Sequence, residues 1–463
     1  MFCSSPTSFG APPNTNVCPV CLGLPGALPM LNRQAVEPAI QAALATRCRI
    51  NRSSRFARKH YFCPNLPKGQ QISQFDEPFA ERGWIEIAIE GYKKRIGLTR
   101  IHLEEDAGKS VHDGFRDSEL YSYVDLNRSD TPLIEIVSDP DLRSSEEAYA
   151  FLTELKLVLQ YVGVSDCDME KGQLRCDANV SVRPRRADKF GTKAEVKNLN
   201  SFRFAKIALD YEIARQVAVL EGGGQVAPDS RLYNAATGET ETMRSKENAH
   251  DYRYFPEPDL EPLQVSEEWV ERLRESMPEL PSDERVRFLK QGLNEYQTQL
   301  LTTTRRLSEY FETAAGVSGD PITTANWIIG ELRRMTNDVD KITPQATGTL
   351  VRKINEGEIS GKMAKGILVK MYETGQPPEE IIGRQRLRQI SDAGTLGMIV
   401  DEVIASNPKQ VEQYKTGKTT VLGFLVGQVM KVSKGQANPA VVNELLSDKL
   451  THSIRLSPER TVG

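Results

Sequence analysis

Residues 101–109 read I-H-L-E-E-D-A-G-K, and a second apolar run with an acid in its middle, L-I-E-I-V, follows at residues 133–137. In the first run, three acids at 104–106 end a strand-like segment and precede Gly108 and Lys109. Magnesium prefers hard oxygen ligands, and a lysine can neutralise phosphate groups. The stretch therefore fits a Mg-nucleotide site. A solvated charged turn is an equally good interpretation of these residues alone, because charge runs usually face water.

The glutamate in the second run, Glu135, is the least surface-like acid of the sequence. A carboxylate inside an apolar strand is costly unless it is paired or bound to a metal. We therefore expect Glu135 to be buried and functional. Clean alternation at 84–90, a turn, and a returning strand at 95–103 place the acids of 104–106 at the end of a strand, on a loop held by a sheet.

A second informative stretch lies at 174–183 and 193–197, where two alternating runs predict an antiparallel strand pair. One face of this pair is apolar. The other carries charged and amide side chains, which include Asp177, Asn179, Glu195 and Lys197. This mixture favours a ligand-binding floor, although solvated polar sheet faces are common.

Helical periodicity predicts helices at 32–45, 144–161 and 201–220, the second opened by a capping box from Ser144 to Glu147. Prolines and a change to helical patterns place a domain boundary near 265 and another near 343. The predicted class is α+β. Its parts are a mixed domain at 1–265, a helical domain at 266–343 and a small helical domain at 344–463.

C-P-V-C at 18–21 has the spacing that can hold two corners of a tetrahedral zinc site. Cys3 is a candidate for the third ligand, and Cys48 or Cys63 for the fourth. A reduced pair of buried thiols, Cys18 and Cys21, is nearly as good an interpretation.

Basic residues that are candidates for binding phosphate or nucleic acid occur in two places. Lys59 lies among aromatic residues at 56–62, a composition that can bind phosphate and stack on bases, although a packed surface loop is the better default. The C-terminal part carries lysines that could form a surface for a nucleic-acid backbone or could be ordinary helix-surface lysines. They are Lys415, Lys418, Lys431 and Lys434, with Arg352 as a further basic residue.

Composition narrows the class of protein. The chain of 463 residues has 39% hydrophobic and 26% charged residues and a net charge of −4, which argues against a generally basic nucleic-acid binder. It contains no run of about 18 apolar residues and no signal peptide at its start. Seven cysteines in so long a chain fit a reducing compartment. We expect a cytoplasmic location, with an organelle as the alternative, and no membrane partner.

Motifs along almost the whole chain resemble the B subunits of the glutamyl/aspartyl-tRNA amidotransferases, the GatB family. Besides residues 101–109 and 132–141, the matching runs include P-N-T-N-V-C-P-V-C-L-G-L-P-G-A-L-P (13–29), L-P-K-G-Q-Q-I-S-Q (66–74), L-R-C-D-A-N-V-S-V-R (174–183), D-Y-R-Y-F-P-E-P-D-L (251–260) and F-L-V-G-Q-V-M-K-V-S-K-G-Q-A-N-P (424–439).

The resemblance implies a mechanism. ATP with Mg²⁺ phosphorylates the side-chain carboxylate of a glutamate or aspartate misacylated onto tRNA(Gln) or tRNA(Asn). Ammonia from glutamine, released by an amidase (A) subunit, then forms the amide in a complex that also contains a small C subunit. It also implies a cradle-shaped first domain and a C-terminal tRNA-binding domain.

On this resemblance we assign roles to named residues. Glu105 and Glu135 are the metal-proximal acids, Glu104 supports them, and Lys59 lies towards the ammonia entry. The residues assigned to nucleotide or substrate binding are Lys109, Arg128, Asp177, Asn179, Glu195 and Lys197. The candidate ligands of a possible structural zinc are Cys3, Cys18 and Cys21. The residues assigned to tRNA binding are Lys415, Lys418, Lys431 and Lys434.

The sequence also departs from the family pattern. The family's first strand, G-L-E-I/V-H-V-Q-L, whose glutamate and histidine resemble metal ligands, has no counterpart here. A cysteine of the zinc-bearing members is Ser5, and a usual glycine is Asp130. Two hypotheses follow: an active amidotransferase subunit, or a catalytically impaired tRNA-binding or scaffold subunit.

Overall fold

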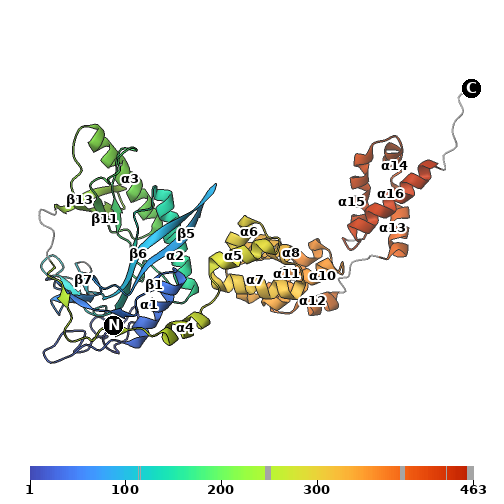
Figure 1. Cartoon of the computed structure of the whole chain (residues 1–463). Coiled ribbons are helices and arrows are strands. Elements are labelled where there is room, and N and C mark those ends of the chain that lie inside the picture. Colours follow the sequence, from blue (N-terminus) through green and yellow to red (C-terminus); the bar gives the residue numbers. More distant parts are fainter. Residues whose placement is uncertain (113, 115, 246–251, 386–391, 434, 456–463) are drawn as a thin grey trace, which may run out of the picture. The chain divides into compact units, whose positions relative to one another are not determined.

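The computed structural model describes the chain apart from residues 113, 115, 246–251, 386–391, 434 and 456–463. The chain forms two compact units, Met1–Pro281 and Ser282–Gly463 (Figure 1). The first unit combines antiparallel sheets with helices. In the second unit, the described residues form helices and no strand. This confirms the predicted α+β class.

The helices and strands of the first unit are α1 (Arg33–Ala45), β1 (Arg49–Ile50), β2 (Ser53–Ser54), β3 (Ala57–His60), β4 (Gln70–Ser73), β5 (Ala80–Ile89), β6 (Tyr92–Glu105), β7 (Lys109–Val111), β8 (Tyr123–Asp125), β9 (Pro132–Ser138), α2 (Ser145–Tyr161), β10 (Ala178–Val180), β11 (Ala194–Lys197), α3 (Phe202–Glu221), β12 (Asp229–Asn234), β13 (Glu239–Ser245), β14 (Phe255–Pro256), β15 (Leu263–Gln264) and α4 (Glu267–Ser276).

The main sheet is organised around β6. Its strand order is β1-β5-β6-β4-β3-β14, and β9 pairs with β6 in addition. All of these pairs are antiparallel. β5 and β6 form the long hairpin predicted from the alternation at 84–103, extended at both strands (Figure 1).

A β-bulge interrupts β6 where it leaves the hairpin. Leu98 pairs with Ser138 and Arg100 pairs with Val137, so β6 contains one extra residue, Thr99, opposite β9. An extra residue of this kind shifts the alternation of the side chains that follow it.

The consequence of the bulge is visible in the burial of β6. Core residues occupy even positions before the bulge, at Ile96 and Leu98, and odd positions after it, at Ile101 and Leu103. Because successive side chains of a strand point to opposite faces, the even positions 100, 102 and 104 lie on the face away from this core.

Helices cover the core face of the sheet. α1, α2 and α4 contribute residues such as Val36, Ile40, Leu155 and Val270 to the same buried cluster as the apolar residues of β5 and β6. α2 lies beside β5 (Figure 1).

A smaller sheet, in the order β10-β11-β12-β13, packs against α3. β10 and β11 form the antiparallel pair predicted from residues 174–197, although the regular strands are shorter than the alternating runs.

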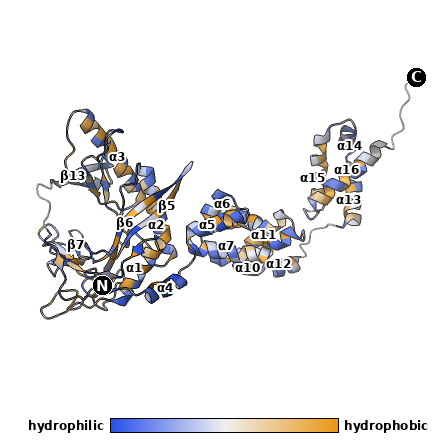
Figure 2. Cartoon of the chain, in the orientation of Figure 1, coloured by the Kyte–Doolittle hydropathy of each residue, from blue (hydrophilic) through white to orange (hydrophobic). Residues whose placement is uncertain are grey.

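The second unit is built from amphipathic helices, whose apolar and polar residues alternate in Figure 2. The elements are α5 (Pro281–Lys290), α6 (Glu295–Leu301), α7 (Arg305–Ser318), α8 (Pro321–Trp327), the π-helix η1 (Ile328–Leu332), α9 (Arg333–Met335), η2 (Val339–Lys341), α10 (Pro344–Asn355), α11 (Gly361–Thr374), α12 (Pro378–Gln385), α13 (Ala393–Ser406), α14 (Pro408–Lys415), η3 (Thr419–Val421), α15 (Leu422–Val432) and α16 (Pro439–Arg455).

The described residues of this unit form two hydrophobic cores. One contains residues from Phe288 to Ile382, and the other contains residues from Leu396 to Leu450. α10 therefore packs with the helices before it, and the predicted boundary near residue 343 lies within the range of residues that forms the first core. The division of the chain into three functional domains at 265 and 343 stays a prediction.

The predicted helices at 32–45, 144–161 and 201–220 are confirmed as α1, α2 and α3. The capping box of α2 is only half formed. Ser144 accepts a hydrogen bond from the Glu147 amide, but the Glu147 carboxylate accepts from Arg143 N and from Lys94 Nζ, both at 2.7 Å. A lysine of β6 draws this glutamate away from the helix cap.

We expect Glu147→Gln to lower the free energy of unfolding of the first unit by about 1–3 kcal/mol near pH 7, because the variant loses a buried, charge-assisted hydrogen bond from Lys94. Burial alone raises the pKa of the Glu147 carboxyl, but the bonds from Lys94 and Arg143 hold it below the ordinary 4.5. A lowered carboxyl pKa contributes stability above the unfolded-state pKa, and this contribution disappears as the pH falls through the folded-state pKa.

The difference between wild type and Glu147→Gln should therefore shrink below about pH 4.5. Denaturant unfolding followed by tryptophan fluorescence at several pH values measures it. Glu146→Gln, on the same turn but exposed, is the matched control and should change stability much less. A pH-independent difference would contradict the role given to the Glu147 charge.

Candidate functional site

The face of β6 that points away from the core carries an acid cluster, defined here as His102, Glu104 and Glu135. His102 pairs directly with Glu135 across β6 and β9. Its Nε2 lies 3.6 Å from Glu135 Oε2 and 3.8 Å from Glu104 Oε2. The ligand atoms of all three residues lie within 4.8 Å of one another.

Burial within the acid cluster corrects one expectation. Glu135 is not buried: 44% of its side chain is exposed. Its neighbours Ile134 and Ile136 pack towards the main core, so Glu135 occupies the outward position between them. The buried members are His102, with 3% of its side chain exposed, and Glu104, with 12%.

Lys59 faces the acid cluster from β3. Its ammonium lies 5.1 Å from the ring centroid of Tyr252 and 5.8 Å from that of Tyr61. Among the described residues it forms no ion pair. Burial alone raises the pKa of Glu104, but His102, Lys59 and the Ser73 hydroxyl together hold it below its usual value. Glu104 is therefore held as a carboxylate next to an ammonium group.

Glu105 lies on the opposite face of β6, so the structure does not bring it together with Glu135 as the sequence suggested. Only 1% of its side chain is exposed. It forms an ion pair with Lys68 and accepts a hydrogen bond from Ile72 N at 2.8 Å. Burial raises the pKa of Glu105 to about 7, while Lys68 acts in the opposite direction. The Thr99 bulge explains why Glu104 rather than Glu105 lies beside Glu135, because it determines which of the two adjacent acids lies on that face of β6.

The acid cluster fits a divalent cation. Two carboxylates are the ligands that Mg²⁺ takes from proteins, and an imidazole suits Mn²⁺ and Zn²⁺. His102 Nδ1 is buried and has no hydrogen-bond partner among the described residues, so the ring retains unused capacity. Sequence reasoning missed His102. The signal was present, because His102 stands two residues before Glu104 on one strand.

A second ionic group joins the end of β6 to a distant loop. Asp106 accepts hydrogen bonds from Arg128 at 2.7 and 2.9 Å and from Arg175 at 2.9 and 3.1 Å. Arg128 also donates to the Gly172 carbonyl. Lys109, another predicted binding residue, is exposed at the start of β7 and joins neither group.

The backbone between these residues contains an unusual conformation. Asp130 has a φ of +67°, the left-handed region that favours glycine. The family pattern described in the sequence analysis expects a glycine here, a residue that adopts this conformation readily.

The predicted polar floor is assembled on the smaller sheet. Lys197 Nζ lies 3.0 Å from Asp177 and 3.2 Å from Glu195. Asn179 is exposed and pairs with Glu195 in the strand register. Three of these four residues thus form one contact group, whose charges are largely paired within the sheet.

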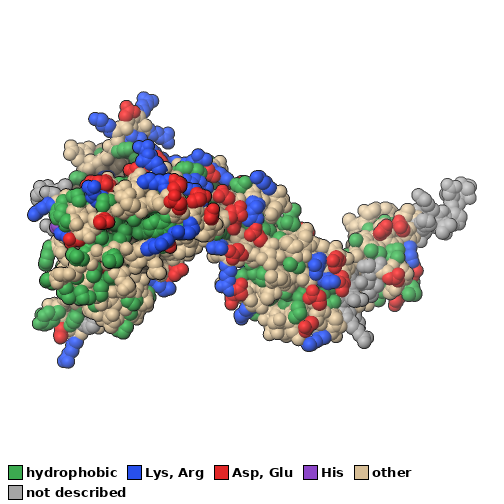
Figure 3. Space-filling model, turned by 60° about the horizontal axis from the view of Figure 1, so that its bottom comes forward, with side chains coloured by type: hydrophobic (Ala, Val, Ile, Leu, Met, Phe, Trp, Pro, Cys, Tyr) green, Lys and Arg blue, Asp and Glu red, His purple; other side chains and the backbone are tan. Residues whose placement is uncertain are grey.

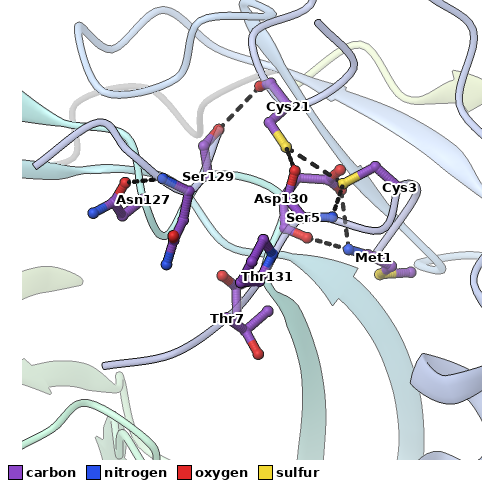
Figure 4. A pocket seen from close by; sticks show the side chains of 11 residues that line it. Met1, Cys3, Ser5, Thr7, Cys21, Asn127, Ser129, Asp130 and Thr131 are labelled. Atoms are coloured by element: carbon purple, nitrogen blue, oxygen red, sulfur yellow. Dashed lines mark hydrogen bonds and ion pairs between the residues drawn. The ribbon is translucent and has the colours of Figure 1, made fainter. Parts of the chain in front are cut away.

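The three candidate zinc ligands come together in the N-terminal loop. Cys21 Sγ lies 3.4 Å from Cys3 Sγ and 3.5 Å from Cys18 Sγ. The fourth polar group is the Ser5 hydroxyl, 3.5 Å from Cys21 Sγ, next to a small polar hollow (Figure 4). Cys48 instead contacts Thr46, and Cys63 is not in the group.

The thiols differ in acidity. Burial alone raises the pKa of Cys18, but hydrogen bonds from the Cys21 amide and the Ser5 hydroxyl lower it to about 7. Burial raises the pKa of Cys21 to about 12. Three thiols and a hydroxyl fit a zinc ion less well than the four sulfur or nitrogen ligands of ordinary structural sites.

Hydrogen bonds to a distant segment also hold this loop. Asn14 Nδ2 donates to the Val124 carbonyl at 3.1 Å and Asn14 Oδ1 accepts from Leu126 N at 2.8 Å. Asn16 N donates to Asn127 Oδ1 at 2.8 Å. The loop therefore has an attachment that involves no cysteine.

The predicted tRNA-binding lysines lie in the last helices. Lys415 ends α14, Lys418 precedes η3, and Lys431 lies in the last turn of α15. Lys434 lies outside the described residues. On the face drawn in Figure 3, acidic and basic side chains are interspersed. None of the helices in the described parts of the chain has both the length and the apolar character needed to cross a bilayer.

Comparison with known proteins agrees with the fold. Residues 1–271 match the GatB/GatE catalytic domain, and residues 309–450 match the GatB domain. The chain is 52% identical to the B subunit of the aspartyl/glutamyl-tRNA(Asn/Gln) amidotransferase of Carboxydothermus hydrogenoformans over 97% of its own length and 95% of that protein.

The same coverage holds for other proteins of that name, from Geotalea uraniireducens at 52% identity and Geobacillus thermodenitrificans at 51%. A sheet face that carries two carboxylates and an imidazole has ligands suited to a divalent cation. The chain belongs to the GatB family, the B subunits of the tRNA-dependent amidotransferases.

The buried pair of Lys68 and Glu105 gives a stability prediction. Lys68→Met leaves Glu105 without its cation and should lower the free energy of unfolding of the first unit by about 3–5 kcal/mol near pH 8. The double variant Lys68→Met/Glu105→Gln, which removes the charge as well, should recover part of this loss.

The pH dependence follows from the sign of the shift. A carboxyl whose pKa is raised on folding binds its proton more tightly in the folded state, so lowering the pH stabilises that state. Lys68 lowers the pKa of Glu105, so its removal raises that pKa above about 7, and the variant gains its proton at a higher pH than wild type. The melting temperature of Lys68→Met should therefore approach that of wild type as the pH falls from 8 towards 7. A constant gap over this range would show that Glu105 does not titrate as its burial requires.

Proposed function

We propose that this chain is the amide-forming subunit of a tRNA-dependent amidotransferase. It phosphorylates the side-chain carboxylate of glutamate on tRNA(Gln) or aspartate on tRNA(Asn), and then directs ammonia to the activated acyl group. The observation that carries the proposal is the acid cluster of His102, Glu104 and Glu135, which reaches solvent at Glu135 and has the Lys59 ammonium nearby.

The chemistry has two steps. In the first, the substrate carboxylate oxygen attacks the γ-phosphorus of ATP, an O–P bond forms, and the bond to the β-phosphate oxygen breaks to release ADP. In the second, ammonia attacks the acyl carbon, a C–N bond forms, inorganic phosphate leaves, and the nitrogen loses a proton. Both steps require charge neutralisation and positioning more than covalent participation of the protein.

The residues of the site suit these requirements. Glu104 and Glu135, with His102, would hold Mg²⁺, which when bound neutralises phosphate charge and orients the phosphate oxygens. Lys59 supplies a fixed positive charge beside Glu104 and lies where ammonia would be received. Glu105, turned to the core, is assigned a supporting role through its pair with Lys68 rather than contact with the metal.

Other parts of the chain are assigned by the same proposal. The group of Asp177, Asn179, Glu195 and Lys197 forms a floor for the acceptor end of tRNA or for the nucleotide. Lys109 and Arg128, which lie outside this group, are assigned to binding of the same ligands. Cys3, Cys18 and Cys21 form a structural site that takes zinc weakly. Lys415, Lys418, Lys431 and Lys434 contact the tRNA backbone.

The proposed partners are an amidase subunit that releases ammonia from glutamine, a small third subunit, and the misacylated tRNA. We infer a cytoplasmic site of action, because seven cysteines without a disulfide among them suit a reducing compartment.

The experiment is reconstitution of the full chain with an amidase and a small third subunit, followed by ATP-dependent amidation of Glu-tRNA(Gln) and Asp-tRNA(Asn). Amide formation that requires ATP supports the proposal. Absence of amide with retained tRNA binding favours the alternative of a scaffold subunit.

In the active complex, Glu104→Gln should lower the rate of amide formation by about 100-fold, because an acid next to the reacting phosphate is removed. Glutamine hydrolysis by the amidase subunit and tRNA binding should change little. Glu86→Gln, an exposed acid of β5, is the control. Equal rates for the two variants would remove Glu104 from the mechanism.

Charge reversal of Lys415, Lys418 and Lys431 should weaken tRNA binding and reduce the slope of log K against log salt concentration by about one for each phosphate that is no longer neutralised. Filter binding at several salt concentrations measures this slope. Charge reversal of Lys362 and Lys370, on α11, is the control. An unchanged slope would contradict the assignment of the last helices to tRNA.

A further inference from the structure

Two neighbouring outward positions of β6 carry buried polar atoms that lack a partner. Among the described residues, the side-chain atoms in this condition are Asn65 Oδ1, Arg100 Nε, His102 Nδ1 and Asp229 Oδ1. Buried polar groups are nearly always hydrogen-bonded, so an unpaired one calls for an explanation. His102 belongs to the acid cluster. Arg100 does not, and neither the fold nor the proposed function has used it.

The Arg100 guanidinium is held by aromatic rings rather than by a carboxylate. Its Cζ lies 5.1 Å from the ring centroid of Phe75. Phe75 stacks on Tyr254 with the centroids 4.7 Å apart and the planes 13° apart. Arg100 forms no ion pair within the described part of the chain. The three residues are named the Arg100 stack.

Other arginines of the first unit show what Arg100 lacks. Arg58 is bound by Glu257 and Asp259, and Arg128 by Asp106. Arg95, on the same strand as Arg100, also lies over an aromatic ring, that of Trp84 at 4.0 Å, but it has Glu86 as an ionic partner at 3.7 Å. The charge of Arg100 is therefore available to a ligand.

The Arg100 stack lies beside the acid cluster. Arg100 and His102 are consecutive outward residues of β6, and Glu104 is the next. The pKa of Tyr254 depends on the same charges. Burial raises this pKa to about 12, and Glu104, Tyr252 and Glu135 also raise it, whereas Arg100 lowers it. Phe75 is 42% exposed, so the open side of the stack reaches solvent.

We propose that Arg100 binds an oxyanion of the reactants beside the acid cluster, either a phosphate oxygen of ATP or the side-chain carboxylate of the aminoacyl group. Phe75 and Tyr254 are positioning residues that hold the guanidinium for this contact. The inference rests on the proposed function and adds a substrate-binding residue to it.

The chemistry of the ligand follows from charge and shape. A guanidinium presents parallel N–H donors that match the paired oxygens of a carboxylate or a phosphate. The acid cluster by itself would repel both reactants, since each is an anion. Lys59 supplies one positive charge to this face, and Arg100 supplies a second, next to His102.

The test uses the full chain in the reconstituted complex, with Arg100→Gln and Arg100→Lys and with Arg95→Gln as the matched control. Arg100→Gln should lower kcat/KM for amide formation by about 10- to 100-fold, the usual effect of losing a hydrogen bond between charged groups. Arg100→Lys should restore only part of it, because lysine keeps the charge and loses the paired donors.

Kinetic and binding measurements with each substrate distinguish the two sources of the oxyanion. If the ligand is a phosphate, KM for ATP rises and binding of a non-hydrolysable ATP analogue weakens, while binding of Glu-tRNA(Gln) is unchanged. If the ligand is the aminoacyl carboxylate, the discrimination between Glu-tRNA(Gln) and uncharged tRNA falls and ATP binding is unchanged.

A double-mutant cycle tests the positioning residues. Phe75→Leu alone should reduce the same kinetic constant several-fold, and it should have no further effect in the Arg100→Gln background, because it acts through Arg100. A purely structural role of Phe75 would give equal losses in both backgrounds.

The inference is overturned if Arg100→Gln keeps kcat/KM and both binding constants within twofold of Arg95→Gln. In that case amide formation by the wild-type complex would still support the proposed function. If the wild-type complex forms no amide, the proposed function fails, and the binding measurements with the ATP analogue and Glu-tRNA(Gln) still decide whether Arg100 binds either anion.

Discussion

The single extra residue in β6, Thr99, is the constraint on which the site depends. Before it, even-numbered residues face the core, and after it odd-numbered residues do. The core must remain apolar, so the bulge sends Arg100, His102 and Glu104 to the opposite face together. Without the extra residue, a pleated strand would place these side chains under α1 and α2, where their charges could not be solvated.

The bulge also gives two adjacent carboxylates different environments. Glu105 is closed in by Lys68 and the Ile72 amide, which ties the end of β6 to β4. Glu104, one residue earlier, meets His102, Lys59 and Ser73 on a face that reaches solvent through Glu135. Burial raises the pKa of Glu105. At Glu104 burial also acts upwards, but the hydrogen bonds and charge of its neighbours together outweigh it, so the two pKa values move apart. One residue anchors the strand while the other remains available for chemistry.

Much of this could be predicted from residue patterns. Alternation predicts the β5–β6 hairpin and the β10–β11 pair, and periodicity predicts α2 and α3, with Ser144 as a further signal for the start of α2. Cysteine spacing predicts the thiol group. The errors have three physical causes. A bulge leaves no mark in the sequence of a strand, so the sequence could not show that Glu105, assigned with Glu135 on the family resemblance, lies on the other face of β6. His102 was missed although it stands two residues before Glu104. The apolar neighbours of Glu135 suggest burial, yet they pack on one face and leave the other open. Lys59 and Lys68 are distant in sequence from Glu104 and Glu105, whose pKa values they lower.

The attachment of Asn14 and Asn16 to residues 124–127 has a consequence for how the N-terminal loop is ordered. These bonds join positions separated by 110 to 112 residues, so they close a long stretch of chain on itself. The loss of conformational entropy on closing such a loop grows only slowly with the length of the loop, and most of this loss already occurs when the main sheet forms. A cation bound at the three thiols would then add little to the ordering of the N-terminal loop. Replacement of one sulfur by the Ser5 hydroxyl is the kind of change that such a loop can accumulate without losing its shape.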